Sequence, residues 1–186
     1  FVAANNLVGK KNIRFSVVRY GNVMGSNGSV IPFFMEKKKE GKLPVTNEKM
    51  TRFNISIEAG VEMVLHALDK SWGGEIFIPK IPSYNILDVA KTICNDCEIE
   101  IVGIRPGEKI HEEMISSSDS IYTYDLGKYY VIIPSTREWN LDEFIKCNKA
   151  VKVKENFNYS SGTNQEWETV ESLKLLIKKY VIDVER

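Results

Sequence analysis

The feature that most constrains this chain is a strand, a glycine-rich loop and a helix that follow one another between residues 13 and 41. The segment 13–20 (IRFSVVRY) is β-branched and apolar, as expected of a buried strand. Gly21 to Gly28 form a loop, and Pro32 suits the first turn of a helix that we expect to end at Gly41. This order is typical of α/β proteins, in which ligands bind beyond the carboxyl ends of strands.

Further strands and helices alternate along the first half of the chain. We expect strands at 43–46, 75–78 and 99–103, a helix that Ser56 caps and Gly73-Gly74 ends, and a second helix over 86–94. In the first of these helices the apolar residues recur at helical spacing, namely at Ile57, Val61, Val64, Leu65 and Leu68. Short strands at 121–124 and 129–133 then precede a polar stretch up to about Glu166 and a closing helix. The sequence therefore predicts an α/β first half and a smaller, irregular α+β second half.

Length and charge narrow the functional classes. The 186 residues are enough for one domain or slightly more, and the 25 basic and 25 acidic residues cancel. This balance argues against nucleic acid as a partner, and it argues against a membrane surface in the same way. The longest apolar runs fall short of the roughly 20 residues that a membrane span needs. The chain opens on Phe1 rather than Met, within the end of a predicted helix, so we expect a fragment.

Three cysteines form no recognisable disulfide framework. Cys94 and Cys97 have the spacing of a redox or zinc pair, but a structural zinc needs two further ligands of matching spacing. A redox pair would begin a helix, whereas Cys94 falls at the end of one, where the helix dipole does not lower a thiol pKa. We therefore expect reduced cysteines in a cytoplasmic protein, with neither a metal nor a redox role.

Two segments have residues suited to binding an anion. In the loop Asn22 to Ser29 the glycines allow backbone N–H groups to approach a phosphate at a helix N-terminus. The spacing matches neither a dinucleotide fingerprint nor a Walker loop, and a plain glycine turn explains it equally well. Arg105, held by Pro106-Gly107 and followed by Glu108, could grip a phosphate or form a surface salt bridge. The same two interpretations stay open for Arg52.

The two histidines and the abundant carboxylates give no clear catalytic group. His66 lies beside core positions of a predicted helix and His111 follows the Arg-Pro-Gly turn, so packed or surface roles are favoured over a base. The sequence contains no recognisable Ser/His/Asp arrangement and no nucleophile next to a base. From these residues alone, this chain is predicted to have no catalytic residue.

Five segments in order nevertheless resemble one family. They are RYGNVMGSNGSVIPFF (19–34), MTRF (50–53), GEIFIPK (74–80), GIRPGEKIHEEMI (103–115) and NYSSGTNQEW (158–167). Together these segments, which extend over nearly the whole chain, resemble the inverting UDP-N-acetylglucosamine 4,6-dehydratases that open pseudaminic acid biosynthesis. These enzymes belong to the extended short-chain dehydrogenase/reductases and, more broadly, to the polysaccharide biosynthesis proteins.

The resemblance implies a Rossmann-type fold that binds NADP, with a small α+β domain for UDP-N-acetylglucosamine. Residues 1–81 would end the Rossmann-type domain, with interleaved substrate-binding segments, and residues 82–186 would form the C-terminal substrate-binding region. The resemblance also assigns residues. Val23 would lie beside the nicotinamide, and the substrate would be bound by Asn22, Asn27, Gly28, Ser29, Val30, Ile31, Arg52, Arg105 and Glu108.

Two departures from the family pattern matter. The glycine fingerprint and the Tyr-x-x-x-Lys pair are absent here and in the family lie upstream, so NADP would be bound mainly by an N-terminal half. Asn54 stands where relatives often have an aromatic residue. We expect a parent lyase that is cytoplasmic and homo-oligomeric, and an inactive fragment. A retaining dehydratase, a 4-epimerase or a non-catalytic nucleotide-sugar-binding module are the alternatives.

Overall fold

The computed structural model describes residues 1–182, which divide into two compact units. The first unit contains residues 1–20, 58–80 and 114–159, and the second contains residues 21–57, 81–113 and the segment from 160 onward. Each unit is thus assembled from three separate stretches of chain. The predicted division at residue 81 into a Rossmann-type part and a substrate-binding part stays a prediction.

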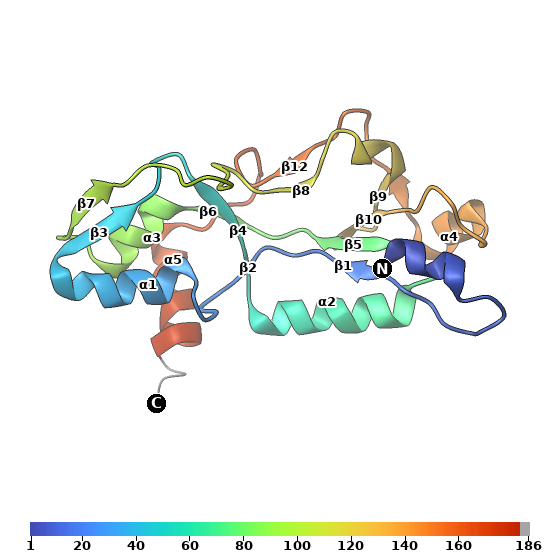
Figure 1. Cartoon of the computed structure of the whole chain (residues 1–186), viewed down its shortest axis with the longest axis horizontal. Helices are drawn as coiled ribbons and strands as arrows, with labels where there is room; N and C mark the ends of the chain where they lie inside the picture. The colour runs from blue at the N-terminus through green and yellow to red at the C-terminus, as the bar shows by residue number, and fades with distance from the viewer. Residues whose placement is uncertain (183–186) are drawn as a thin grey trace. The chain divides into compact units, whose positions relative to one another are not determined.

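A five-stranded sheet forms the centre of the first unit, with the strand order β1-β5-β10-β9-β11. The β1–β5 pair is parallel and the other three pairs are antiparallel. Figure 1 shows α2 alongside β1 and β5. The elements are η1 (Val2–Leu7), β1 (Val17–Val18), α2 (Ile57–Lys70), β5 (Ile76–Pro79), η3 (Asp119–Tyr122), β9 (Thr123–Asp125), β10 (Tyr129–Ile132), α4 (Leu141–Asn148) and β11 (Val151–Lys152).

Helix α2 has two apolar stripes, and the one that faces the protein is not the one that periodicity favours. Met63 and Ala67 are buried, and they join Phe77, Val131 and Phe144 in the core of the first unit. The aliphatic residues of the predicted stripe are instead 45–78% exposed, namely Ile57, Val61, Val64, Leu65 and Leu68. The apolar residues at the predicted helical spacing are therefore not the face through which α2 packs in the first unit.

Two small sheets and three α-helices build the described part of the second unit. The strand order β2-β4-β6 defines one sheet, and β3 pairs in parallel with β7 to form the other. Within the first sheet, β2 is parallel to β4 and β6 is antiparallel to it. The elements are β2 (Asn22–Val23), α1 (Val30–Lys37), η2 (Lys38–Glu40), β3 (Lys42–Val45), β4 (Thr51–Ile55), β6 (Ser83–Asn85), α3 (Ile86–Ile93), β7 (Glu98–Ile101), α5 (Val170–Ile177) and the π-helix η4 (Lys178–Ile182).

The core of the second unit lies among these three helices and the β3 strand. Phe34 from α1, Leu43 from β3, Val89 from α3 and Leu173 from α5 are each at most 1% exposed and belong to one cluster. Local signals specify the helix starts: Asn85 accepts a hydrogen bond from the Leu87 N–H, and Thr169 forms a reciprocal capping box with Ser172. The second unit therefore has a closed core that fixes the N-terminal end of α1.

The α/β fold class is confirmed, with two differences in the details. The expected strand 13–20 shortens to β1, and the polar stretch before Glu166 contains a helix, α4, that was not predicted. Asn140 begins α4 by accepting hydrogen bonds from the Asp142 and Glu143 N–H groups, and Phe144 is buried. Two further strands, β8 (Glu113–Ile115) and β12 (Tyr159–Ser160), pair with each other, and each contains a residue at which the chain passes between units.

The cysteines depart from the sequence-based expectation. Cys94 ends α3, as predicted, but it forms a disulfide with Cys97, so the expectation of reduced thiols was wrong for this pair. The turn between α3 and β7 brings the two Cα atoms to 5.4 Å, within the range that a disulfide requires. Cys147 stays a free, exposed thiol. Over residues 1–182, none of the helices combines the length and the apolar character that crossing a bilayer requires.

Candidate functional site

A cavity of about 530 Å³ in the second unit gathers most of the predicted binding residues. Its volume is within the range usual for small-molecule sites. Eight predicted residues line it, namely Asn22, Asn27, Gly28, Ser29, Val30, Arg52, Arg105 and Glu108. Ile31 belongs to the core beneath, where it is 3% exposed, and Val23 pairs with Ile55 in the small sheet. Residues distant in sequence thus meet around one hollow.

The N-terminus of α1 contributes an unpaired hydroxyl group to this cavity. Ser29 is the N-cap residue of α1, yet its side chain makes no capping hydrogen bond. Its Oγ is buried and has no hydrogen-bond partner among the residues that the structure describes. A helix N-terminus attracts negative charge, and a buried hydroxyl without a partner costs about 1–3 kcal/mol. An anionic oxygen placed here would be favoured by the helix dipole and could accept the hydroxyl hydrogen.

Arg105 lies on a turn that its neighbours hold rigidly. Glu108 accepts a hydrogen bond from the Arg105 N–H at 3.1 Å, and its own N–H donates to the Arg105 carbonyl at 3.0 Å. Gly107, at φ 86°, adopts the left-handed conformation that the turn requires. The Arg105 side chain is exposed, and within residues 1–182 its guanidinium has no hydrogen bond or ion pair. Glu108 thus fixes the turn, while Arg105 keeps its donors available to a ligand.

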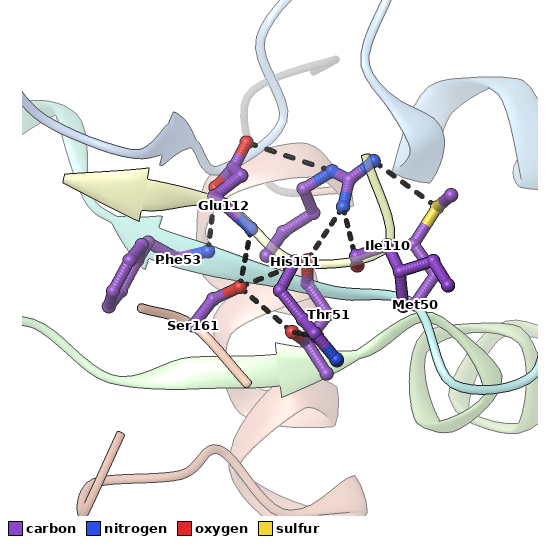
Figure 2. Close-up of polar contacts among 8 residues, drawn as sticks. Met50, Thr51, Phe53, Ile110, His111, Glu112 and Ser161 are labelled. Atoms are coloured by element: carbon purple, nitrogen blue, oxygen red, sulfur yellow. Dashed lines mark hydrogen bonds and ion pairs between the residues drawn. The ribbon is translucent and has the colours of Figure 1, made fainter. Parts of the chain in front are cut away.

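Arg52 differs from Arg105 because the protein itself uses most of its donors. Its Nη1 donates to the carbonyls of Thr51 at 2.7 Å and Ile110 at 3.1 Å, and its Nη2 donates to the Met50 sulfur at 3.2 Å. Its Nε lies 3.6 Å from Glu112 Oε1, in an ion pair. Figure 2 labels the four residues that this guanidinium contacts, namely Met50, Thr51, Ile110 and Glu112. Arg52 still lines the cavity, but it also ties the segment 110–112 to β4.

A polar network explains why the MTRF, HEE and YSSGTN segments occur together. The Ser161 hydroxyl accepts a hydrogen bond from the Glu112 N–H at 2.9 Å and lies 2.8 Å from Thr51 Oγ1 (Figure 2). Thr51 Oγ1 also lies 2.8 Å from His111 Nδ1. A Cβ at position 162 would lie 2.6 Å from the His111 ring, so only glycine fits there. His111 thus contacts both Thr51 and Gly162, and the expectation that it is a packed or surface histidine rather than a base stays a prediction.

Two ionisable groups at the site went unnoticed in the sequence. Burial raises the pKa of Glu112, although the Phe53 N–H and Arg52 act in the opposite direction. Burial also raises the pKa of Tyr84, which lines the cavity and pairs with Arg52 across β4 and β6. The sequence places Glu112 beside His111 in an acidic pair, but nothing local distinguishes it from Glu113. Only the fold shows which carboxylate turns inward.

Three comparisons with known proteins indicate the family and the fold of this chain. A family model described as "Polysaccharide biosynthesis protein" matches residues 1–134. An inverting UDP-N-acetylglucosamine 4,6-dehydratase of Campylobacter jejuni is 49% identical over 95% of this chain and 55% of its own length. A UDP-glucose 4-epimerase of Rickettsia canadensis is 37% identical over 89% of this chain and 50% of its own length. This chain therefore spans about half the length of the curated relatives it matches.

Among solved structures, Pen from Bacillus thuringiensis is similar, with a TM-score of 0.79 and 30% identity over 96% of this chain and 53% of its own. The structural neighbours have the Rossmann-type fold of extended short-chain dehydrogenase/reductases, so the fold that the sequence resemblance implied is confirmed.

Proposed function

Because this chain belongs to the polysaccharide biosynthesis protein family, we propose that it is the substrate-binding part of an inverting UDP-N-acetylglucosamine 4,6-dehydratase. The proposed enzyme is a lyase that starts pseudaminic acid biosynthesis. The identity of 49% to the Campylobacter jejuni dehydratase supports the substrate and the reaction. We also propose that the full-length enzyme is a homo-oligomer in the cytoplasm, as expected from the sequence.

One observation carries this proposal: a cavity that combines the unpaired Ser29 hydroxyl at the α1 N-terminus with the available guanidinium of Arg105. A diphosphate is the part of a nucleotide sugar that needs such groups, since it has two negative charges and only acceptor oxygens. Guanidinium donors and a helix N-terminus are the usual partners of phosphate in proteins. The cavity volume leaves room for a sugar or a base beside the phosphates.

The proposed cofactor, NADP, would depend on this chain for little of its binding. Val23 is half-buried at the end of β2, and an apolar, β-branched side chain there suits contact with a flat ring. The glycine fingerprint that cradles a pyrophosphate is absent from the sequence, so the described residues alone do not make a dinucleotide site. The cofactor would supply hydride transfer, while the residues of this chain bind and orient the sugar nucleotide.

A 4-epimerase is the second candidate, and the 37% identity to the Rickettsia canadensis enzyme favours it specifically. Both reactions use a nucleotide sugar, so the binding residues do not separate them. The product does. A dehydratase releases a 4-keto-6-deoxy sugar nucleotide, which weighs one water less than its substrate, whereas an epimerase leaves the mass unchanged. Mass spectrometry of the product of the full-length protein therefore decides between the two.

Substitution of Arg105 tests the binding role directly. In the full-length protein we expect Arg105→Ala to raise KM for UDP-N-acetylglucosamine by roughly 10- to 150-fold, since a charge-assisted hydrogen bond contributes about 1.5–3 kcal/mol. If Arg105 binds ground and transition states equally, kcat will change much less. Arg105→Lys should recover only part of the loss, because lysine has no bidentate geometry. Steady-state kinetics measure each effect.

Two further variants control this test. Lys109→Ala removes an exposed cation from the same turn and should leave KM within about twofold. Arg52→Ala should raise KM and also lower Tm, because Arg52 holds the Thr51 and Ile110 carbonyls. An Arg105→Ala enzyme with an unchanged KM would remove Arg105 from the binding site and contradict the proposed diphosphate contact.

A further inference from the structure

A half-buried carboxylate supports one wall residue of the cavity from behind. Glu112 does not line the cavity, but its Oε2 accepts a hydrogen bond from the Phe53 N–H at 3.0 Å. The Asn22 side chain does line the cavity, and the end of its amide group that faces Glu112 lies 2.8 Å from Oε1 and 3.2 Å from Oε2. Glu112 thus contacts two neighbouring parallel strands, β2 through Asn22 and β4 through Phe53.

The chemistry of the two groups fixes the orientation of the Asn22 amide. An ionised carboxylate only accepts hydrogen bonds, so the end of the amide that faces Glu112 must be its NH₂ group. The opposite orientation would direct the carbonyl oxygen of Asn22 at the carboxylate, with acceptor against acceptor. The carbonyl oxygen is therefore the group that Asn22 can offer to a ligand.

We infer that Glu112 is a positioning residue that holds the Asn22 carboxamide with its carbonyl oxygen toward the ligand, so that this wall selects a hydrogen-bond donor. The inference rests on the proposed function, since the donors of a nucleotide sugar are the hydroxyl and N–H groups of its sugar and base. A phosphate oxygen has no hydrogen to donate and would be repelled here. The division of the cavity follows: Ser29 and Arg105 face the diphosphate, and Asn22 faces the sugar.

Replacing Glu112 with glutamine would keep the shape of the side chain at position 112 but would no longer fix the orientation of the Asn22 amide. The glutamine side chain offers one acceptor and one NH₂ group, so an Asn22 amide of either orientation finds a partner. The Asn22 carbonyl would then no longer be held toward the sugar. We expect Glu112→Gln to weaken the binding of UDP-N-acetylglucosamine about tenfold, the effect of losing roughly one hydrogen bond, and to leave UDP binding within about twofold.

The experiment is isothermal titration calorimetry on the full-length protein, with UDP-N-acetylglucosamine and UDP as the two probes. The variants are Glu112→Gln, Asn22→Ala, their combination and Glu113→Gln, which changes the exposed neighbouring carboxylate. If Glu112 acts through Asn22, Glu112→Gln will have no further effect in the Asn22→Ala protein. Glu113→Gln should bind both probes as the unmodified protein does. Thermal melting of each variant reports whether it is folded.

Each outcome decides the inference. Equal weakening of both probes, or additive effects of the two substitutions, would make Glu112 a merely structural residue and overturn the inference while the proposed function stands. Failure of the folded, unmodified protein to bind either probe would overturn the proposed function and the inference with it. If Glu112→Gln does not fold, Asn22→Ala alone decides, because a loss for UDP as large as that for the sugar nucleotide contradicts a sugar contact.

Discussion

The two units differ in how far they bury the large aliphatic side chains of their helices. In the second unit, helices α1, α3 and α5 direct residues such as Leu173 into a shared core, where its side chain is 0% exposed. In the first unit, α2 packs through Met63 and Ala67 and leaves Leu68 78% exposed. Helices α5 and α2 both have apolar residues at helical spacing, so this spacing alone does not show which face of a helix is buried. Packing partners, rather than periodicity, decide it.

A pair of identical substitutions gives the largest contrast between the units. We expect Leu173→Ala to lower the free energy of unfolding of this chain by about 2–5 kcal/mol, since it leaves a cavity in a closed core. Leu68→Ala should change it by no more than about 0.5 kcal/mol, because the side chain is already in water. Urea denaturation measures both.

The same pair in the full-length protein sharpens the contrast. A large cost of Leu68→Ala there would show that another part of that protein covers α2. Similar costs for the two substitutions in the 186-residue chain would contradict the distinction between a closed core and an exposed stripe.

The disulfide of the second unit should have an intermediate effect. Reduction, or Cys94→Ser, should lower the free energy of unfolding by about 2 kcal/mol, the value that chain entropy gives for a loop of about four residues. Cys147→Ser, which changes the exposed free thiol of the first unit, is the matched control and should have no measurable effect. Unfolding curves recorded with and without a reductant test this. Superimposable curves would mean that the disulfide adds nothing to the stability of the second unit.

The smallest effect is a pH dependence that originates in the first unit. Burial against Phe77 and Tyr129 lowers the pKa of His66. The positive charges of Lys70 and Lys128 lower this pKa further, and the negative charges of Asp69 and Glu62 act in the opposite direction. A histidine whose folded-state pKa is depressed stabilises the fold above its unfolded-state value near 6.5, and this contribution is lost as the pH falls through the folded-state pKa. Because His66 is only half-buried, Tm should fall by only about 1–2 °C on this account.

The His66 contribution is isolated by comparison with His66→Gln at each pH. Glu75 in the same unit has a pKa that burial raises, so it changes stability in the opposite sense, and the difference between the two proteins cancels it. A difference in Tm that stays constant from pH 7.5 to 5.5 would show that folding does not lower the pKa of His66.

Local signals predicted most of the fold, and long-range contacts account for what they did not. Ser29 and Asn85 mark helix starts within a few residues, so α1 and α3 could be predicted from the sequence. Helix α4 was missed because it is only eight residues long and Phe144 is its one fully buried residue. For the site, the loop after β2 and the turn at Arg105 were identified through resemblance to a family. The role of Arg52 could not be predicted, since Ile110, whose carbonyl it binds, lies 58 residues away.

The Ser161 network also has a consequence for the order of events during synthesis. Thr51 and Ser161 are 110 residues apart, and their hydrogen bond closes a loop of that length. A nascent chain that has not yet reached Ser161 can form α1 and the β2–β4 pair, but it cannot tie β4 to the segment that contains His111 and Glu112 through the serine. Because domains form as their segments emerge from the ribosome, this wall of the cavity is completed late. Ligand binding should therefore first become possible only after Ser161 has been synthesised.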